Sequence, residues 1–178
     1  MTNLNIGEHF IYNGIEFICL DIIDGNYLAM TAEIYDAIPF DVKGYNDWRK
    51  SSLRRVLNND FLSKLNKKHL VMQASDLIAD NGDRSYGTSE DYVTILSCDQ
   101  HRKYREIVPR SNKWMWTLTP WGCSVPNSWN GYSARVVYPT GELSYSHVRY
   151  SYGVAPVCLF SSKKLKVSRQ VHLVSADE

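Results

Sequence analysis

The later part of the chain consists of short β-prone runs that Pro, Gly and Asn interrupt. Residues 114–160 hold four of the five Trp, together with many Tyr, Ser, Asn and Gly. This pattern favours short strands joined by loops. Rigid aromatic side chains mixed with small hydrogen-bonding residues are also typical of a binding surface, because they give a large contact area at a low cost in conformational entropy.

The strands of this stretch are predicted from its turns. We expect a strand over 114–118, a break at 120–122, a hairpin that pairs 132–138 with 142–148, and a further strand over 153–160. Within the second hairpin strand, we expect Leu143 and Tyr145 to point inward and Ser144 and Ser146 outward. Trp114 and Trp116 are predicted to lie in the core. A short edge strand is expected around residues 165–167.

Aromatic and basic residues of the loops 121–132 and 145–152 are the candidate binding residues. Aromatic side chains and Arg dominate protein interfaces, since they bury a large area and keep a polar tip for hydrogen bonds. The alternative is that half or more of these rings fill a small core. The candidates are Trp121, Trp129, Tyr132, Tyr145, His147, Arg149, Tyr150 and Tyr152.

Length and composition indicate one globular domain, which we place at residues 1–168, followed by a mobile tail at 169–178. Residues 1–110 form its meander and helices and residues 111–168 its aromatic half. The 178 residues are 44% hydrophobic and 22% charged, and the net charge of +1 gives no overall attraction to nucleic acid or membrane.

The N-terminus has no basic and apolar leader pattern, so we expect a soluble cytoplasmic product. The four Cys lie far apart, which favours free buried thiols over a zinc site.

The first third of the chain predicts a β-meander followed by a helix. Asn13-Gly14 and Asp24-Gly25 are hairpin turn signals, and they divide residues 8–12, 15–22 and 26–31 into three strands. Residues 32–50 read as a loop that Trp48 anchors on the core. From Ser51 apolar residues recur at helical spacing, and the cluster 58–60 is expected to end one helix and cap the next.

The middle of the chain predicts a polar loop, a strand and a second helix. Residues 75–92 carry several acids without the spacing of a calcium loop, so we expect a turn-rich surface loop there. A strand over 92–96 leads into Ser97-Cys98-Asp99-Gln100, a capping box, and its helix is expected to run to the residues before Pro109. Basic residues of both helices form either a solvated face or a contact for phosphates.

Several segments together resemble a domain family of unknown function that phages and prophages of Gram-positive bacteria carry. The N-terminal meander precedes the pattern W-x-x-S-S-L-R-x-x-L-N-x-x-F, which residues 48–61 match. Residues 86–91, 96–99 and 104–105 are also similar. The motifs T-P-W, A-R-V-V, T-G-E-L-S-Y and Y-G-V-A-P follow in the aromatic half. The resemblance covers nearly the whole chain.

The resemblance implies a C-type-lectin-like fold, related to that of formylglycine-generating enzymes. The expected fold class is α+β, with small antiparallel sheets, an N-terminal β-meander and flanking short helices. The acidic ligands of calcium-dependent lectins are missing around Val125-Pro126-Asn127 and Trp129-Asn130. Cys123 and Cys158 likewise lack the paired motif of the oxidases. We therefore expect no metal, no cofactor and no inherited activity of either kind.

From these observations we predict that the chain is a phage- or prophage-encoded, non-enzymatic binding module. Its partner would be a host-surface glycan or protein if it belongs to the virion. If it is intracellular, the partner would be a host defence factor or its nucleotide signal. One alternative is an enzyme acting on a saccharide or nucleotide, with Asp99, His101 or His147 as acid or base. The other is a nucleic-acid-binding protein; a membrane contact is not expected, and self-association is left open.

Overall fold

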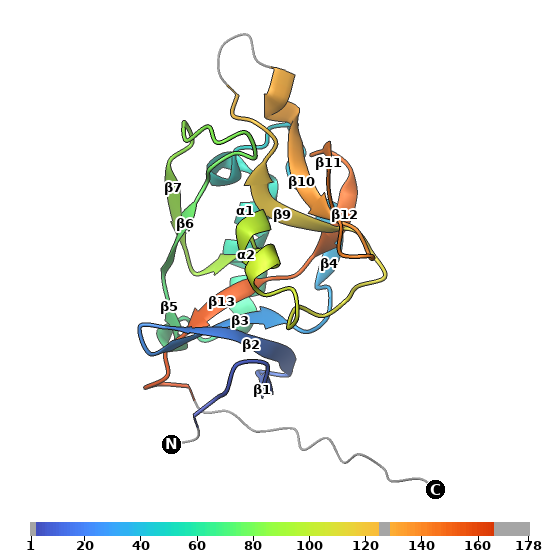
Figure 1. Cartoon of the computed structure of the whole chain (residues 1–178). Helices are drawn as coiled ribbons and strands as arrows, with labels where there is room; N and C mark the ends of the chain where they lie inside the picture. The colour runs from blue at the N-terminus through green and yellow to red at the C-terminus, as the bar shows by residue number, and fades with distance from the viewer. Residues whose placement is uncertain (1–2, 125–128, 166–178) are drawn as a thin grey trace, which may run out of the picture.

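The computed structural model describes residues 3–124 and 129–165, and for residues 129 and 130 the backbone only. Within this part, two β-sheets lie at the two ends of the molecule, with a short helical segment between them and a two-stranded hairpin at the side (Figure 1). The sheets are antiparallel or mixed and the helices few and short, so the fold is α+β. The predicted edge strand at 165–167 and the tail from 169 fall at or beyond the end of the described residues.

The first sheet contains the predicted meander. The turn residues Asn13, Gly14, Asp24 and Gly25 all have φ values between 50° and 78°, as the two hairpin turns require. The meander is therefore confirmed. The strand order is β1-β2-β3-β13-β5, and β8 also pairs with β13. The strands are β1 (His9–Tyr12), β2 (Ile15–Ile23), β3 (Asn26–Thr31), β13 (Val157–Phe160), β5 (Leu70–Val71) and β8 (Val93–Thr94).

The second sheet contains the aromatic half of the chain. Its order is β11-β10-β9-β12-β4, in which only the β12–β9 pair is parallel. The predicted hairpin of β10 and β11 is confirmed. β9 continues through Pro120, so the predicted break at 120 was wrong. The strands are β4 (Asp36–Pro39), β9 (Met115–Pro120), β10 (Ser133–Val137), β11 (Leu143–His147) and β12 (Ser151–Val154).

One predicted strand proves to be two, which connect the sheets. Residues 153–160 divide at Ala155-Pro156 into the end of β12 and the whole of β13. Pro156 lacks an N–H for a sheet ladder, but its carbonyl accepts a hydrogen bond from Thr31 N at 3.0 Å. The chain thus passes directly from one sheet to the other at this point.

Two predicted loops also contain strands. β4 lies within residues 32–50, where it pairs with β12. β7 (Thr88–Asp91) lies within the expected polar loop 75–92, and it forms a hairpin with β6 (Gln73–Asp76), which begins just before that loop. Asp91 of this hairpin is buried, because its carboxylate accepts hydrogen bonds from Trp48 Nε1 at 2.9 Å and Arg54 Nε at 2.7 Å. The acidic composition suggested solvent exposure that this residue does not have.

The helical segments are shorter than predicted. Asn58 does not end a helix, since it lies in a π-helical turn and its side chain donates to the carbonyls of Arg54 and Val93. The capping box of Ser97 and Gln100 is confirmed, but its helix ends at Lys103, well before Pro109. The helices are η1 (Trp48–Lys50), α1 (Ser52–Val56), η2 (Leu57–Phe61), η3 (Leu62–Lys64), η4 (Lys67–His69), α2 (Cys98–Lys103) and η5 (Trp129–Tyr132).

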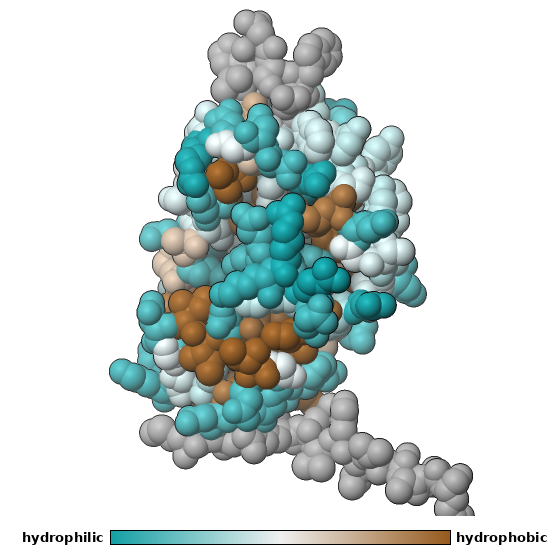
Figure 2. Space-filling model, viewed as in Figure 1, coloured by the Kyte–Doolittle hydropathy of each residue, from teal (hydrophilic) through white to brown (hydrophobic). Residues whose placement is uncertain are grey.

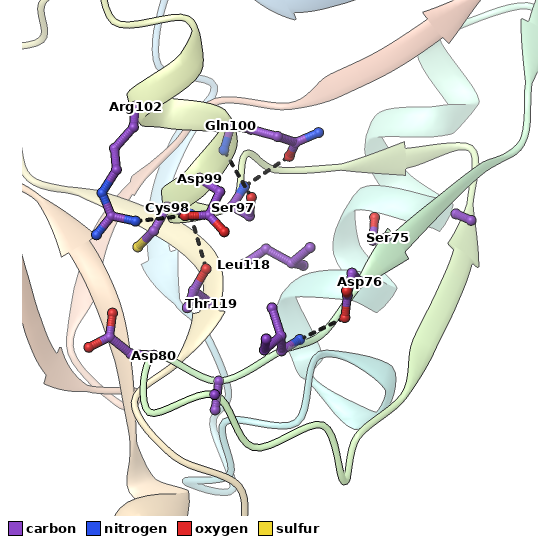
Figure 3. A pocket seen from close by; sticks show the side chains of 14 residues that line it. Ser75, Asp76, Asp80, Ser97, Cys98, Asp99, Gln100, Arg102, Leu118 and Thr119 are labelled. Atoms are coloured by element: carbon purple, nitrogen blue, oxygen red, sulfur yellow. Dashed lines mark hydrogen bonds and ion pairs between the residues drawn. The ribbon is translucent and has the colours of Figure 1, made fainter.

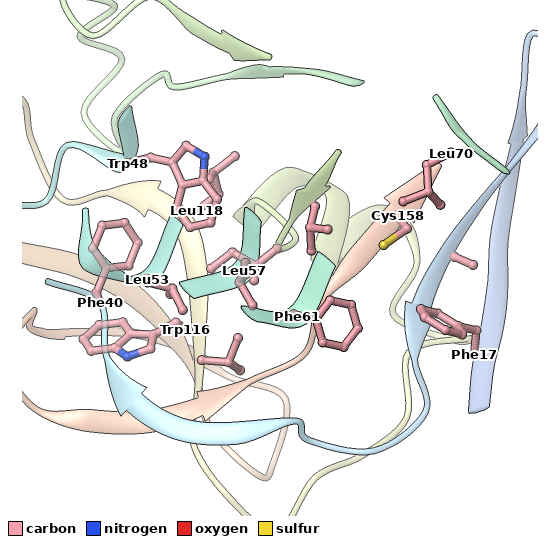
Figure 4. Packing of buried hydrophobic residues seen from close by; sticks show 14 of the residues in the cluster. Phe17, Phe40, Trp48, Leu53, Leu57, Phe61, Leu70, Trp116, Leu118 and Cys158 are labelled. Carbon is pink, nitrogen blue, oxygen red and sulfur yellow. The ribbon is translucent and has the colours of Figure 1, made fainter. Parts of the chain in front are cut away.

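The main hydrophobic core joins the two sheets through this helical segment (Figure 4). Leu53, Leu57 and Phe61 are fully buried between Trp116 of β9 and Phe17 of β2. Each such side chain contributes roughly 1.5–3 kcal/mol on burial. Trp48 belongs to the same core, as predicted, and so does Trp116. All four Cys are free and buried, which confirms the expectation for the thiols.

Candidate recognition surface

The outer side of the β10–β11 hairpin presents aromatic and basic side chains. Arg135 pairs with Tyr145 across the two strands, and Ser133 pairs with His147. Side chains two residues apart on a strand point to the same side, so Tyr145 and His147 share one face of the sheet. The side chain of Tyr145 is 55% exposed, whereas Ser146 is buried. The prediction that Tyr145 points inward and Ser146 outward was therefore wrong, because the alternation of the strand was right but its phase was reversed.

Trp121 holds Tyr145 in place on this face. The two rings lie 4.4 Å apart between centroids and are inclined by 34°. Arg135 Cζ lies 5.3 Å from the centre of the Trp121 ring, in a cation–π arrangement. The Nε atom of Arg135 lies 3.3 Å from a carboxylate oxygen of Asp80. Trp121 thus has an arginine and a tyrosine as close neighbours, which restricts its freedom.

A second group of rings continues from His147 to the adjoining loops. The rings of Tyr132 and His147 are parallel, at an interplanar angle of 1°, with their centres 6.2 Å apart. Tyr45 lies 6.4 Å from Tyr132, and Tyr150 lies 6.3 Å from His147. We call the six side chains of the two groups the aromatic face. It consists of Tyr45, Trp121, Tyr132, Tyr145, His147 and Tyr150.

The tyrosines of the aromatic face have free hydroxyl groups. Within the part of the chain that the structure describes, the hydroxyls of these four tyrosines make no hydrogen bond. Other tyrosines use theirs: Tyr86 donates to Asn46, Tyr104 to Asp21 and Tyr138 to Ser144. The face therefore combines half-exposed rings with unused hydrogen-bonding groups, as interface tyrosines do. Its free hydroxyls belong to Tyr45, Tyr132, Tyr145 and Tyr150.

Arg149 borders the aromatic face and is fixed by the loop opposite. Its Nη2 donates to the carbonyl oxygen of Lys43 at 2.9 Å, and its backbone N–H donates to His147 Nδ1 at 3.3 Å. The second bond makes Nδ1 an acceptor, so the remaining proton of a neutral His147 ring belongs on Nε2. Gly44 lies directly beneath the guanidinium, where a Cβ atom would come within 2.9 Å of Arg149 Nε.

Buried polar groups hold the loop that carries Tyr45. The carboxylate of Asp41 accepts hydrogen bonds from the backbone N–H groups of Tyr45 and Ser52, both at 3.0 Å. The backbone N–H of Asp41 donates to Val148 O at 3.1 Å, next to the turn that presents Arg149. One buried acid thus ties the loop 41–45 to both α1 and the end of β11.

Asn46 fixes the other side of the same loop. Its side-chain amide donates to the carbonyls of Gly122 and Ser133 at 2.9 and 2.7 Å, and its oxygen accepts from the Tyr86 hydroxyl at 2.8 Å. Burial raises the pKa of Tyr86 to about 12, so this hydroxyl remains a donor at neutral pH. Because the loop and the strands are connected through buried hydrogen bonds, the aromatic face is preorganised.

Two of the predicted binding residues lie elsewhere. Tyr152 is half-buried on the opposite side of the sheet, where its ring packs on Trp114 and Trp116 and its hydroxyl shares a hydrogen bond with Ser146. The side chain of Trp129 lies outside the described residues. Trp114 is 38% exposed, so the prediction that it lies in the core was wrong. The sequence did not single out Tyr45, because it lies in a segment that read as a connecting loop.

The candidate acid and base residues of the alternative enzyme function come from two different elements. Asp99 and His101 lie on α2 and His147 lies on β11, and within the described residues neither histidine is hydrogen-bonded to a carboxylate. The cavity beside α2 measures about 410 Å³ and is lined by three aspartates (Figure 3). Each of these forms an ion pair with an arginine: Asp76 with Arg84, Asp80 with Arg135, and Asp99 with Arg102. Among the described residues, no group of three or more His, Cys, Asp or Glu is placed to hold a metal ion.

The basic residues of the first helical segment also have internal partners. Arg54 forms an ion pair with Asp91. Lys64 and Lys67 lie over the rings of Tyr35 and Tyr92, at 4.8 and 4.6 Å from their centres. Three basic side chains of this segment therefore have partners within the chain.

A separate apolar patch lies on the first sheet. Figure 2 shows hydrophobic atoms over the lower part of the molecule, where β2, β3 and β13 lie in Figure 1. Ile22, Ile23 and Met72 are exposed apolar side chains of this sheet and of the residue after β5. They are useful for comparison, because their exposure resembles that of the aromatic face while their side chains carry no hydrogen-bonding group.

No helix within the described residues is long and apolar enough to span a membrane. Comparisons with protein-family models, with curated proteins and with solved structures give no match to this chain.

Proposed function

We propose that the chain is a non-enzymatic recognition module that binds a protein partner through the aromatic face. The observation that carries the proposal is the set of four half-exposed tyrosines whose hydroxyls make no hydrogen bond within the described residues. A partner can bury these rings and pair their hydroxyls in the same contact. Tyr and Arg are the residues that most often supply the dominant binding energy at protein interfaces.

Rigidity of the face supports the same function. Asp41 and Asn46 hold the loops from beneath, and Trp121 packs against Tyr145. A preorganised surface loses less conformational entropy on binding, so more of the contact energy appears as affinity. Arg149, which borders the face beside His147, would favour acidic side chains on the partner.

The proposal extends to the setting in which the module acts. Its sequence motifs resemble a phage- and prophage-borne family, and we propose a C-type-lectin-like scaffold that presents its loops to a host protein. A virion component would meet that protein on the cell surface, and an intracellular product would meet it in the cytoplasm. The small sheets of an α+β chain suit either setting, since the contact depends on the presented loops.

The test compares two double variants of the tagged full-length chain. Tyr145→Ala/Tyr150→Ala removes two exposed rings of the aromatic face, and Ile22→Ala/Met72→Ala removes two exposed apolar side chains of the other sheet. Wild type and both variants are immobilised on a resin. Each is used to capture binding partners from host-cell lysate and from separated cell-wall fractions, and mass spectrometry identifies them. We expect a protein that wild type and the Ile22/Met72 variant retain and the tyrosine variant loses, since an interface anchor contributes about 2 kcal/mol or more.

Three results contradict the proposal. The first is that both variants retain the same proteins as wild type. The second is that both lose them equally. The third is capture of a cell-wall glycan in place of a protein, which would assign the aromatic face to carbohydrate recognition. Melting temperatures of the variants show whether any loss arises from unfolding.

A further inference from the structure

A second cavity lies apart from the aromatic face. One side of it is formed by α2 and the segment that follows α2, and the other side by the turn of the β10–β11 hairpin. It measures about 280 Å³. None of the six residues of the aromatic face lines it. The charged residues of its lining are Arg102, Arg105, Arg110 and Glu142, and His101 also lines it. Arginines thus predominate among the charged residues of this lining, although the whole chain is nearly neutral.

The arginines of this cavity are available to a ligand to different degrees. Arg110 has no ion pair within the described part of the chain. Within the described residues, Arg105 pairs only with its neighbour Glu106, in a largely exposed contact that contributes little. Arg102 pairs with Asp99 and lies on the border with the cavity of Figure 3. Arg105 and Arg110 are thus the two cations that a ligand would engage first.

The remaining lining is apolar and buried. Val108, Met115 and Val137 are nearly inaccessible to solvent, and Leu143 is half-buried beside them. A further void of only about 10 Å³ shares the lining residues Val108, Met115 and Val137. An apolar interior with cationic groups among its lining suits a ligand that has an apolar body and one anionic group.

Two hydroxyl groups complete the polar part of the cavity. Ser111 Oγ accepts a hydrogen bond from Lys113 N at 3.0 Å, which leaves its own proton free to donate. Thr140 Oγ1 lies 3.2 Å from Glu142 Oε2 and donates to it, so the Thr140 hydroxyl already has an acceptor within the turn. Burial, followed by Arg102 and Arg105, lowers the pKa of His101, so its ring is neutral at neutral pH. An oxyanion would therefore meet donors from Ser111 and the guanidinium groups.

We propose that this cavity binds the tetrahedral oxyanion of a small phosphate or sulfate monoester, with the apolar body of the ester against Val108, Met115 and Val137. A guanidinium presents its N–H groups as a planar fork, and two of them can share the oxygens of one tetrahedral group. The proposal concerns a site separate from the aromatic face and does not depend on the proposed protein partner.

The test titrates the full-length chain with phenyl phosphate, phenyl sulfate, benzoate and inorganic phosphate, by calorimetry and by NMR of ¹³C-labelled Met methyl groups. We expect saturable binding of phenyl phosphate or phenyl sulfate at one site, tighter than that of inorganic phosphate. The methyl of Met115 should shift and that of Met72 should not. Arg105→Ser/Arg110→Ser should weaken binding by at least about tenfold, because two charge-assisted contacts are lost.

Arg55→Ser is the matched control, since Arg55 is an exposed arginine of α1 and does not line the cavity. It should bind the esters as wild type does. Preference for phenyl phosphate or for phenyl sulfate identifies which ester the cavity takes, and both support the proposal. The proposal is overturned if binding of neither ester saturates, or if benzoate binds as tightly as the esters. It is also overturned if the double variant retains wild-type affinity, or if the methyl signal of Met72 shifts in place of that of Met115.

Discussion

The guanidinium of Arg149 lies over the α-carbon of Gly44, and the contact joins the turn after β11 to the loop that presents Tyr45. Gly44 has a φ of +96°, and a Cβ atom there would lie 2.9 Å from Arg149 Nε. Glycine is required for two reasons, because the backbone is left-handed and because the arginine lies so close. The position of Arg149 beside the aromatic face thus depends on a residue without a side chain.

Gly44→Ala should both destabilise the chain and weaken partner binding. The strained backbone costs about 1–3 kcal/mol, and the new methyl group displaces Arg149 from Lys43 O. Gly141→Ala is the control, since its φ is +89° and its Cβ would contact nothing within 4 Å. Urea unfolding should show a similar loss of stability for both variants, while only Gly44→Ala weakens the captured complex. Equal affinities of the two variants would show that Arg149 has no part in binding.

Asp91→Ala should destabilise the core strongly. The carboxylate accepts from Trp48 Nε1, Arg54 Nε and Ser89 Oγ at 2.9, 2.7 and 2.7 Å, and all three donors would lose their acceptor. Because buried unpaired donors are costly, we expect the free energy of unfolding to fall by at least about 2 kcal/mol in urea denaturation. Arg54 is partly exposed and can turn to water, which limits its share.

Glu106→Ala is the matched control for Asp91→Ala. It also removes a carboxylate paired with an arginine, but both side chains of that pair are largely exposed. Exposed pairs contribute little, so its unfolding midpoint should stay near that of wild type. Equal effects of the two substitutions would mean that the buried network around Trp48 does not support the fold.

Asp21→Asn should reduce stability at neutral pH and make the chain less sensitive to acid. Burial alone would raise the pKa of Asp21, but hydrogen bonds from Lys103 Nζ at 2.6 Å, the Tyr104 hydroxyl at 2.7 Å and Ile22 N more than offset it and lower the pKa below 3.8. A folded-state pKa below the unfolded one means that the contribution to stability is complete above pH 3.8. It is lost as the pH falls through the folded-state value.

Urea denaturation at neutral pH and at an acidic pH below the folded-state pKa of Asp21 measures this effect. Wild type and Asp21→Asn should differ at neutral pH and converge in acid. Asp24→Asn, in the neighbouring turn, removes a carboxylate that makes no hydrogen bond within the described residues, and should lose stability in parallel with wild type. A gap between wild type and Asp21→Asn that persists in acid would contradict the assignment.

Local signals in the sequence predicted the parts of the fold that local chemistry decides. The meander followed from Asn13-Gly14 and Asp24-Gly25, whose positive φ values close two hairpins. The capping box of Ser97 and Gln100 fixed the start of α2. Such features depend on residues a few positions apart, so they can be read before the tertiary structure is known.

Features that depend on distant partners were missed or reversed. The alternating pattern of β11 does not say which of its two faces points inward. In the structure, Tyr145 packs on Trp121 on one side of the sheet and Ser146 bonds Tyr152 on the other. Tyr45 joins the aromatic face through Asp41 and Asn46, whose partners are distant in the sequence: Asn46 bonds Ser133, 87 residues away, and Asp41 bonds Val148, which is farther still. No periodicity within the loop itself could indicate these contacts.

The most direct test of the aromatic face is tyrosine nitration of the full-length chain, with and without the captured partner, read by mass spectrometry. Free protein should be nitrated first at Tyr45, Tyr132, Tyr145 and Tyr150. Burial raises the pKa of Tyr86 to about 12, which keeps that buried ring unreactive. Bound partner should protect those four tyrosines and leave Tyr35 and Tyr92, beside the helical segment, as they are in the free chain. Protection of Tyr35 and Tyr92 with continued nitration of the four would contradict the account, because the partner would then bind elsewhere.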